Sequence, residues 1–236
     1  MAVAAALLTG SQDGTNASSY GTASISPAAN RLIIALVLNR VGAGTPNTPS
    51  LSGNSLTWVQ QRTEVEAATF RYRISVFRAM GASPSSGAVS ISFSGQTQNY
   101  CGWIIAELSG VDTSGSNGVG AIVQDNGYAN TTNTLTPSVS LSAFESAANA
   151  TLGCFIHGQG TPINPGAGFT EVADISVESN EQIYMEFRAG NDTTVDCTAT
   201  TGTGNFSGGI ALEIRAAAVG GNAARAMQQY RQRRVG

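Results

Sequence analysis

Three glutamates have the residue type and the setting that acid–base chemistry would need. Glu107, Glu186 and Glu213 each fall in an apolar stretch that predicts a β-strand. Two carboxyl groups about 5–10 Å apart in a cleft are enough for glycoside hydrolysis. Glu107 and Glu213, however, take the polar positions of alternating strands, which face solvent. We expect these glutamates on the surface. A two-carboxylate hydrolase is therefore the third functional hypothesis, after the two non-catalytic functions given at the end of this section.

Other reactive side chains are few and widely spaced. His157 is the only histidine, it lies at the end of a predicted strand, and no Gly-x-Ser-x-Gly motif accompanies it. Cys101, Cys154 and Cys197 are too far apart for a CxxC metal site and fit buried residues of a protein made in a reducing cytosol. Residues 125–130 (DNGYAN) could offer oxygens to calcium, but Asn-Gly is better explained as a turn. We predict no catalytic residue, metal or cofactor.

The composition limits the class of protein that can carry these residues. Charged residues make up 11% of the 236 residues, against about 25% in an ordinary soluble protein. Hydrophobic residues reach 42%, which excludes disorder over most of the length. No window approaches the 18 apolar residues of a membrane helix. The chain therefore belongs to a globular protein with a sizeable core.

Short apolar runs separated by Gly- and Pro-rich stretches indicate an all-β fold. Residues 31–38 are continuously apolar after Arg31, as in a strand covered on both faces, whereas residues 69–76 alternate. No internal repeat of fixed period is visible. We predict a jelly-roll-like β-sandwich of roughly 10–12 strands over residues 19–215, with an N-terminal arm (1–18) and a basic C-terminal arm (216–236) that is helical or extended.

One predicted hairpin carries opposite charges on its two strands. Glu64 and Glu66 precede a possible turn, and Arg71 and Arg73 follow it. With a four-residue loop, Glu66 would lie opposite Arg71 and Glu64 opposite Arg73, a register that cross-strand ion pairs would stabilise. We expect a solvated hairpin face there; a patch that faces a partner is the alternative.

The C-terminal segment has the opposite charge to the rest of the chain. Residues 1–214 contain seven arginines and fifteen acidic residues, whereas residues 215–236 contain five arginines and no acid. A basic tail on an acidic body is typical of an interaction arm, and the acidic body argues against nucleic-acid binding. The predicted partner-binding residues are Arg225, Met227, Tyr230, Arg231, Arg233 and Arg234.

Five stretches spread over residues 50–215 resemble a known group of proteins. They are residues 56–60 (LTWVQ), 73–87 (RISVFRAMGASPSSG), 93–98 (FSGQTQ), 108–115 (LSGVDTSG) and 191–196 (NDTTVD). In these stretches the chain is similar to proteins of tailed-phage virion gene clusters. The resemblance implies a β-sandwich and a virion context; it defines no catalytic site and does not include the arginine-rich tail.

Two non-catalytic functions follow as expectations. The first is a capsid decoration or cement protein, made in the host cytoplasm and placed on the outer capsid surface of the virion. Its partners would be the major capsid protein and further copies of itself, a trimer being compatible with local threefold positions, and its contacts would include residues 1–9 and the tail. The alternative is a lectin-like module that binds carbohydrate through Trp58, Trp103 or Tyr128. Of these, Trp103 fits the core and Tyr128 an exposed loop.

Overall fold

The computed structural model describes residues 2–131, 134–158, 162–178, 181–200 and 206–218. This part of the chain forms sixteen antiparallel strands and one 3-10 turn, η1 (Val119–Ala121). The all-β sandwich that the sequence predicts is therefore confirmed. No helix within these residues is long and apolar enough to cross a membrane.

The first eight strands form one module, residues 4–109, with a five-stranded and a three-stranded sheet. The strands are β1 (Ala4–Asp13), β2 (Ser19–Gly21), β3 (Leu32–Arg40), β4 (Ser50–Ser52), β5 (Val59–Glu66), β6 (Tyr72–Ala79), β7 (Ser90–Ser92) and β8 (Tyr100–Ser109). The order is β1-β8-β3-β6-β5 in the large sheet and β2-β7-β4 in the small one. Eight strands in two such sheets give a jelly-roll-like sandwich.

The second eight strands form a second module, residues 122–214. They are β9 (Ile122–Asn130), β10 (Ser138–Ser140), β11 (Ala150–His157), β12 (Ile163–Pro165), β13 (Thr170–Val177), β14 (Glu181–Arg188), β15 (Thr194–Ala199) and β16 (Ser207–Ile214). The orders are β13-β14-β11-β16-β9 and β10-β15-β12. Adding eight to each strand number of the first module reproduces both orders, so the fold is an internal duplication.

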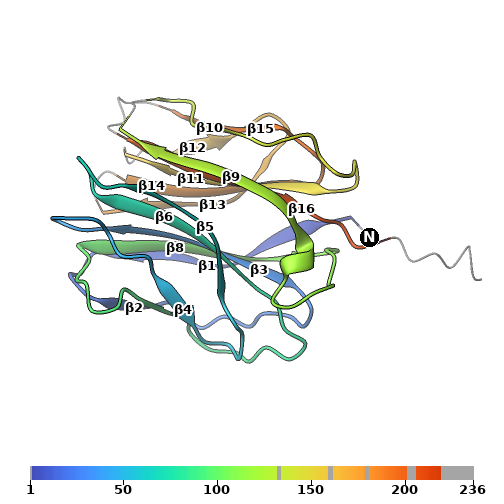
Figure 1. Ribbon diagram of the computed structural model, residues 1–236, viewed down its shortest axis with the longest axis horizontal. Coiled ribbons are helices and arrows are strands. Elements are labelled where there is room, and N and C mark those ends of the chain that lie inside the picture. The colour runs from blue at the N-terminus through green and yellow to red at the C-terminus, as the bar shows by residue number, and fades with distance from the viewer. Residues whose placement is uncertain (1, 132–133, 159–161, 179–180, 201–205, 219–236) are drawn as a thin grey trace, which may run out of the picture.

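The two modules stack into four layers, with the large sheets in the middle and a small sheet outside each (Figure 1). The large sheets share the central core, which receives Leu36 from β3 and Cys154 from β11. Each module also has its own core between its large and small sheets. The central strand β3 contributes to two cores, and its residues 32–38 are almost completely buried, as its continuous apolar pattern predicts.

Two contacts at corresponding positions of the modules join them at the tips of their hairpins. The Tyr72 ring stacks on Phe206 at 4.2 Å, and the Tyr72 hydroxyl lies 2.8 Å from two carbonyl oxygens of the second module, those of Asn130 and Ser207. At the corresponding place Glu181 of the second module forms a 2.9 Å ion pair with Arg40 of the first. One contact is aromatic and the other ionic, although the backbone positions correspond.

The structure corrects two expectations about the elements. Sixteen strands are present in the described residues instead of roughly 10–12, because several have only three residues and leave no alternating pattern. Residues 4–13, expected within an N-terminal arm (1–18), form β1, which pairs with β8 and completes the large sheet.

The predicted hairpin register is wrong by one residue. Glu66 lies opposite Tyr72, and Glu64 lies opposite Ile74, so the loop has five residues instead of four. The Glu66 carboxylate stabilises this loop by accepting hydrogen bonds from the four backbone N–H groups of residues 68–71, at 2.6–3.1 Å. Local capping of the loop replaces the expected cross-strand ion pairs.

Candidate functional site

The two ends of the described chain are fixed side by side at one end of the molecule (Figure 1). At the N-terminal end, Val3 is buried in the central core and Ala4 lies opposite Ser109 of β8. At the C-terminal end, the Ala217 N–H donates a 2.8 Å hydrogen bond to the carbonyl oxygen of Gly110, the residue that follows Ser109. Both ends are therefore anchored to the segment that leaves β8.

A surface pocket lies at the base of the C-terminal arm. The pocket has a volume of about 410 Å³, and Glu145, Asn149 and residues 215–218 form part of its lining. The Arg215 guanidinium forms a 2.6 Å ion pair with Glu145, and the Asn149 side-chain oxygen accepts the Ala216 N–H at 3.1 Å. These contacts hold residues 215 and 216 against the second module.

The predicted partner-binding residues Arg225, Met227, Tyr230, Arg231, Arg233 and Arg234 lie outside the described residues. Of the predicted arm (216–236), the structure describes only residues 216–218, and Ala216 forms a β-bridge with Val111.

Glu213 and Glu107 accept hydrogen bonds from backbone N–H groups instead of forming an acid–base pair. Glu213 is completely buried, which corrects its expected exposure; it accepts hydrogen bonds from Gln124, Asn149 and the backbone N–H of Glu145 at 2.6–2.9 Å. Glu107, the corresponding residue on β8, accepts the Ala28 N–H at 3.0 Å. Each carboxylate thus fixes the segment that enters the central strand of its module.

Glu186 is also buried, contrary to its expected exposure. One of its carboxylate oxygens accepts the Gly166 N–H at 3.0 Å, and the other has no hydrogen-bond partner. Burial raises the pKa of this carboxyl to about 8; the Gly166 hydrogen bond opposes the change, and the charges of Asp196 and Asp192 add to it. The raised pKa therefore favours the protonated, neutral form of the group at pH 7.

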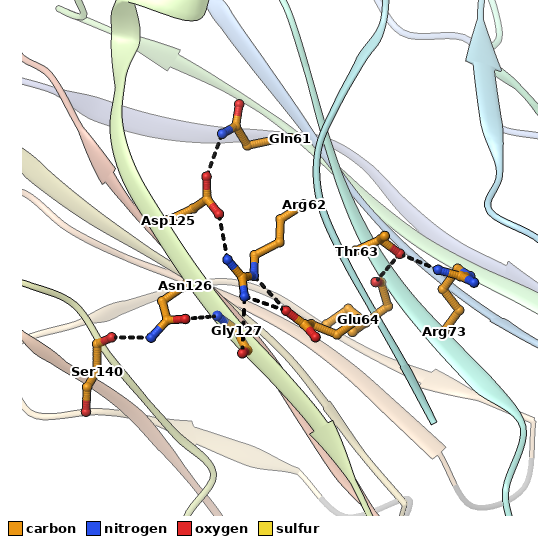
Figure 2. Close-up of polar contacts among 10 residues, drawn as sticks. Gln61, Arg62, Thr63, Glu64, Arg73, Asp125, Asn126, Gly127 and Ser140 are labelled. Atoms are coloured by element: carbon orange, nitrogen blue, oxygen red, sulfur yellow. Dashed lines mark hydrogen bonds and ion pairs between the residues drawn. The ribbon is translucent and has the colours of Figure 1, made fainter. Parts of the chain in front are cut away.

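A polar network closes one seam between the large sheets, where β5 lies beside β9 (Figure 2). Arg62 pairs with Glu64 at 2.7 Å and with Asp125 at 3.0 Å, and Gln61 donates to Asp125 at 2.6 Å. Residues 125–130, considered as a turn or a calcium loop, belong instead to strand β9. Asp125 is thus a structural link between the modules.

The remaining candidate residues have structural positions. His157 is completely buried, with its Nε2 atom 3.0 Å from the Thr134 carbonyl oxygen. Trp103 is in the core, as predicted, whereas Tyr128 lies on β9, partly buried, with its hydroxyl 3.4 Å from that of Ser207. The three cysteines are buried and form no disulfide, as predicted, and burial raises the pKa of the Cys101 thiol.

Within the described residues, no group of three or more His, Cys, Asp or Glu side chains is placed to hold a metal ion. Comparison with protein-family models, with curated proteins and with solved structures finds no match to this chain.

Proposed function

We propose that this chain is a non-catalytic structural protein of a tailed-phage virion, which decorates or cements the outer capsid surface by bridging neighbouring capsid subunits. The observation that carries the proposal is the anchoring of both chain ends at one end of the double module. The basic C-terminal segment therefore starts from one defined place on an otherwise acidic body.

The charge distribution supports an arm that binds acidic partners. Residues 215–236 carry five arginines and no acid, whereas the preceding chain has an excess of eight acidic residues over arginines. Arginine forms bidentate hydrogen bonds with carboxylates, such as those of a major capsid protein or a neighbouring copy. Such contacts add buried area to those made by the body of the protein.

The layered architecture suits a protein that must keep its shape on a lattice. Three cores run through four sheets, and the duplicated modules offer two related surfaces in one chain. A rigid body loses little conformational entropy on binding, so more of the contact energy appears as affinity.

The glycan-binding alternative has less support. Trp103 is buried, and the Tyr128 hydroxyl is paired. Trp58 is half-buried against the core of the first module. These positions do not form the coplanar exposed pair that would favour carbohydrate.

Co-sedimentation with purified capsids that lack this protein tests the proposal. The full chain is compared with a version that ends at Ala218, which keeps the Ala217–Gly110 hydrogen bond and the bridge at Ala216. A second variant replaces Arg225, Arg231, Arg233 and Arg234 with glutamine, which keeps the length of the arm but removes its charge.

We expect saturable binding of the full chain, weaker binding of both variants, and a loss of affinity as salt increases. Binding that survives both changes would keep the decoration role and assign the contact to the body. Absence of binding by the full chain would refute the proposal.

A further inference from the structure

The two outer cores, each between a large and a small sheet, differ at one pair of corresponding positions. Glu186, the sixth residue of β14, lies opposite Gly153 of β11. Phe77, the sixth residue of β6, lies opposite Ala35 of β3, and both belong to the outer core of the first module. Gly153 and Ala35 are each the fourth residue of their strand. The second module therefore has a carboxyl group where the first has a phenyl ring.

Two polar atoms in the outer core of the second module have no hydrogen-bond partner among the described residues. They are the Oε1 atom of Glu186 and the hydroxyl of Tyr184, which lie on the same face of β14, and both side chains are completely buried. A Cβ atom at Gly153 would lie 2.9 Å from the Oε1 atom, so this oxygen is packed against the backbone of β11. A buried polar atom without a partner costs free energy, so the closed state of this core carries a local penalty.

The groups around Glu186 do not compensate a negative charge. β10 and β12 contain no titratable side chain, and Gly166, which follows β12, donates its N–H to Glu186. The titratable groups that interact with Glu186 or come from the adjacent strand β13 are Asp196, Cys197, Asp192, Cys154, Tyr184, Glu171 and Asp174. None of these is basic, and Asp192 is itself paired with Arg188. An ionised Glu186 therefore favours a state in which water reaches it.

The sheet that covers Glu186 is small and lies on the outside of the four layers (Figure 1). β10 and β12 have three residues each, and each pairs with β15 over three residues. Elements with few backbone hydrogen bonds open locally at a lower free energy than that of complete unfolding. Local opening of the β10-β15-β12 sheet therefore requires few bonds to break.

From these observations we infer that Glu186 makes the β10-β15-β12 sheet a pH-dependent cover, which opens locally when the carboxyl group loses its proton while the small sheet of the first module stays closed. Opening exposes apolar side chains of the outer core, such as Val139 and Val195.

The direction of the pH dependence follows from the two states of the carboxyl group. Glu186 has a pKa of about 8 in the closed protein and its ordinary value of 4.5 once it is solvated. Between these values the open state releases a proton that the closed state keeps, so the opening constant should rise by up to about tenfold per pH unit and level off above about pH 8. Below about pH 4.5 both states are protonated, and the closed state is favoured most.

Each core contains one buried cysteine that can report its opening. Cys101 lies in the outer core of the first module, Cys154 in the central core and Cys197 in the outer core of the second module. Labelling of the full chain with a pyridyl disulfide at pH 5, 6, 7, 8 and 9, followed by mass spectrometry of its peptides, gives a rate for each cysteine. Dividing this rate by that of the same cysteine in the urea-unfolded chain at the same pH gives the opening constant.

We expect the opening constant of Cys197 to exceed that of Cys101 by about tenfold or more at pH 8, and to fall by up to about tenfold per pH unit towards pH 5. Glu186→Gln should remove most of this pH dependence. Tyr184→Phe is the matched control, since it changes the other unpartnered group of the same core without changing a charge, and it should keep the pH dependence. Far-UV circular dichroism checks that both variants fold.

Two results would overturn the proposal. Equal opening constants for Cys101 and Cys197 would show that labelling requires complete unfolding, which exposes both thiols together. A pH dependence of Cys197 labelling that Glu186→Gln leaves unchanged would show that another group controls the opening. The assay contains no capsid, so its outcome is independent of the decoration role.

Discussion

Replacing Glu186 with glutamine should stabilise the protein at pH 8 and remove much of the pH dependence of its stability. The carboxyl group is completely buried on β14, where one oxygen accepts the Gly166 N–H and the other has no partner. Burial raises its pKa to about 8, so a charged carboxylate is costly there. Glutamine has a similar shape and stays neutral at every pH.

The size of the effect follows from the two pKa values. The carboxyl ionises near pH 4.5 in the unfolded chain and near pH 8 in the folded protein. Between these values the folded state keeps a proton that the unfolded chain releases, so the free energy of unfolding falls as the pH rises. The stabilisation that the protonated carboxyl contributes to the folded state is fully present below about pH 4.5. Each unit of difference between the two pKa values corresponds to about 1.4 kcal/mol, so at most about 5 kcal/mol is lost by pH 8.

Urea unfolding followed by far-UV circular dichroism at pH 5, 6, 7 and 8 measures this contribution. The stability of Glu186→Gln relative to the natural chain should increase steadily over this range. A relative stability that is constant from pH 5 to pH 8, or that decreases, would refute the reasoning.

Glu66→Gln is a matched variant for which the pH dependence of stability should have the opposite sign. Burial opposes ionisation of Glu66, but the backbone N–H groups of residues 68–71 outweigh it and lower the pKa below its ordinary value of 4.5. Its contribution to stability is therefore present above pH 4.5 and lost as the pH falls through the lower, folded-state pKa. Glu66→Gln should cost most stability at pH 7–8 and less near pH 3.

Three substitutions test the energetics of the module interface by the same unfolding assay. Leu36→Ala should lower the free energy of unfolding by about 2–5 kcal/mol, because Leu36 is completely buried in the central core; a cost below about 1 kcal/mol would contradict that packing. Tyr72→Phe should cost about 1–3 kcal/mol, because it removes the hydroxyl that donates to the part-buried Asn130 carbonyl and the buried Ser207 carbonyl. Arg62→Ala should cost no more than about 1 kcal/mol, because its ion pairs are partly exposed; a larger loss than that of Tyr72→Phe would show the polar seam to be the stronger link.

The all-β class can be predicted from the residues, but the number of strands and the duplication cannot. Two weak sequence signals mark it once the strands are aligned. Residues 104–108 (IIAEL) correspond to residues 210–214 (IALEI), and residues 42–46 (GAGTP) resemble residues 158–162 (GQGTP). The intervening segments differ in length, so no fixed period results. The duplicated strand order is far clearer than the residual sequence likeness.

The acidic residues show why a site could not be placed from local patterns. Alternation correctly identifies strands, but it assigns polar positions to solvent only where one face of the sheet is exposed. In this fold the large sheets are covered on both faces, so Glu186 and Glu213 are buried. The partners of Glu213, at positions 124, 145 and 149, come from separate segments of the chain.

Composition, alternation and charge suffice to predict an all-β sandwich, the doubly covered strand at residues 32–38, the buried cysteines and an acidic body with a basic tail. These properties depend on residue type and on near neighbours along the chain. The four layers, the hairpin register and the buried carboxylates depend on pairing between distant segments. Only the tertiary structure decides them, because the same local pattern can pair, face water or face another sheet according to what the rest of the chain places beside it.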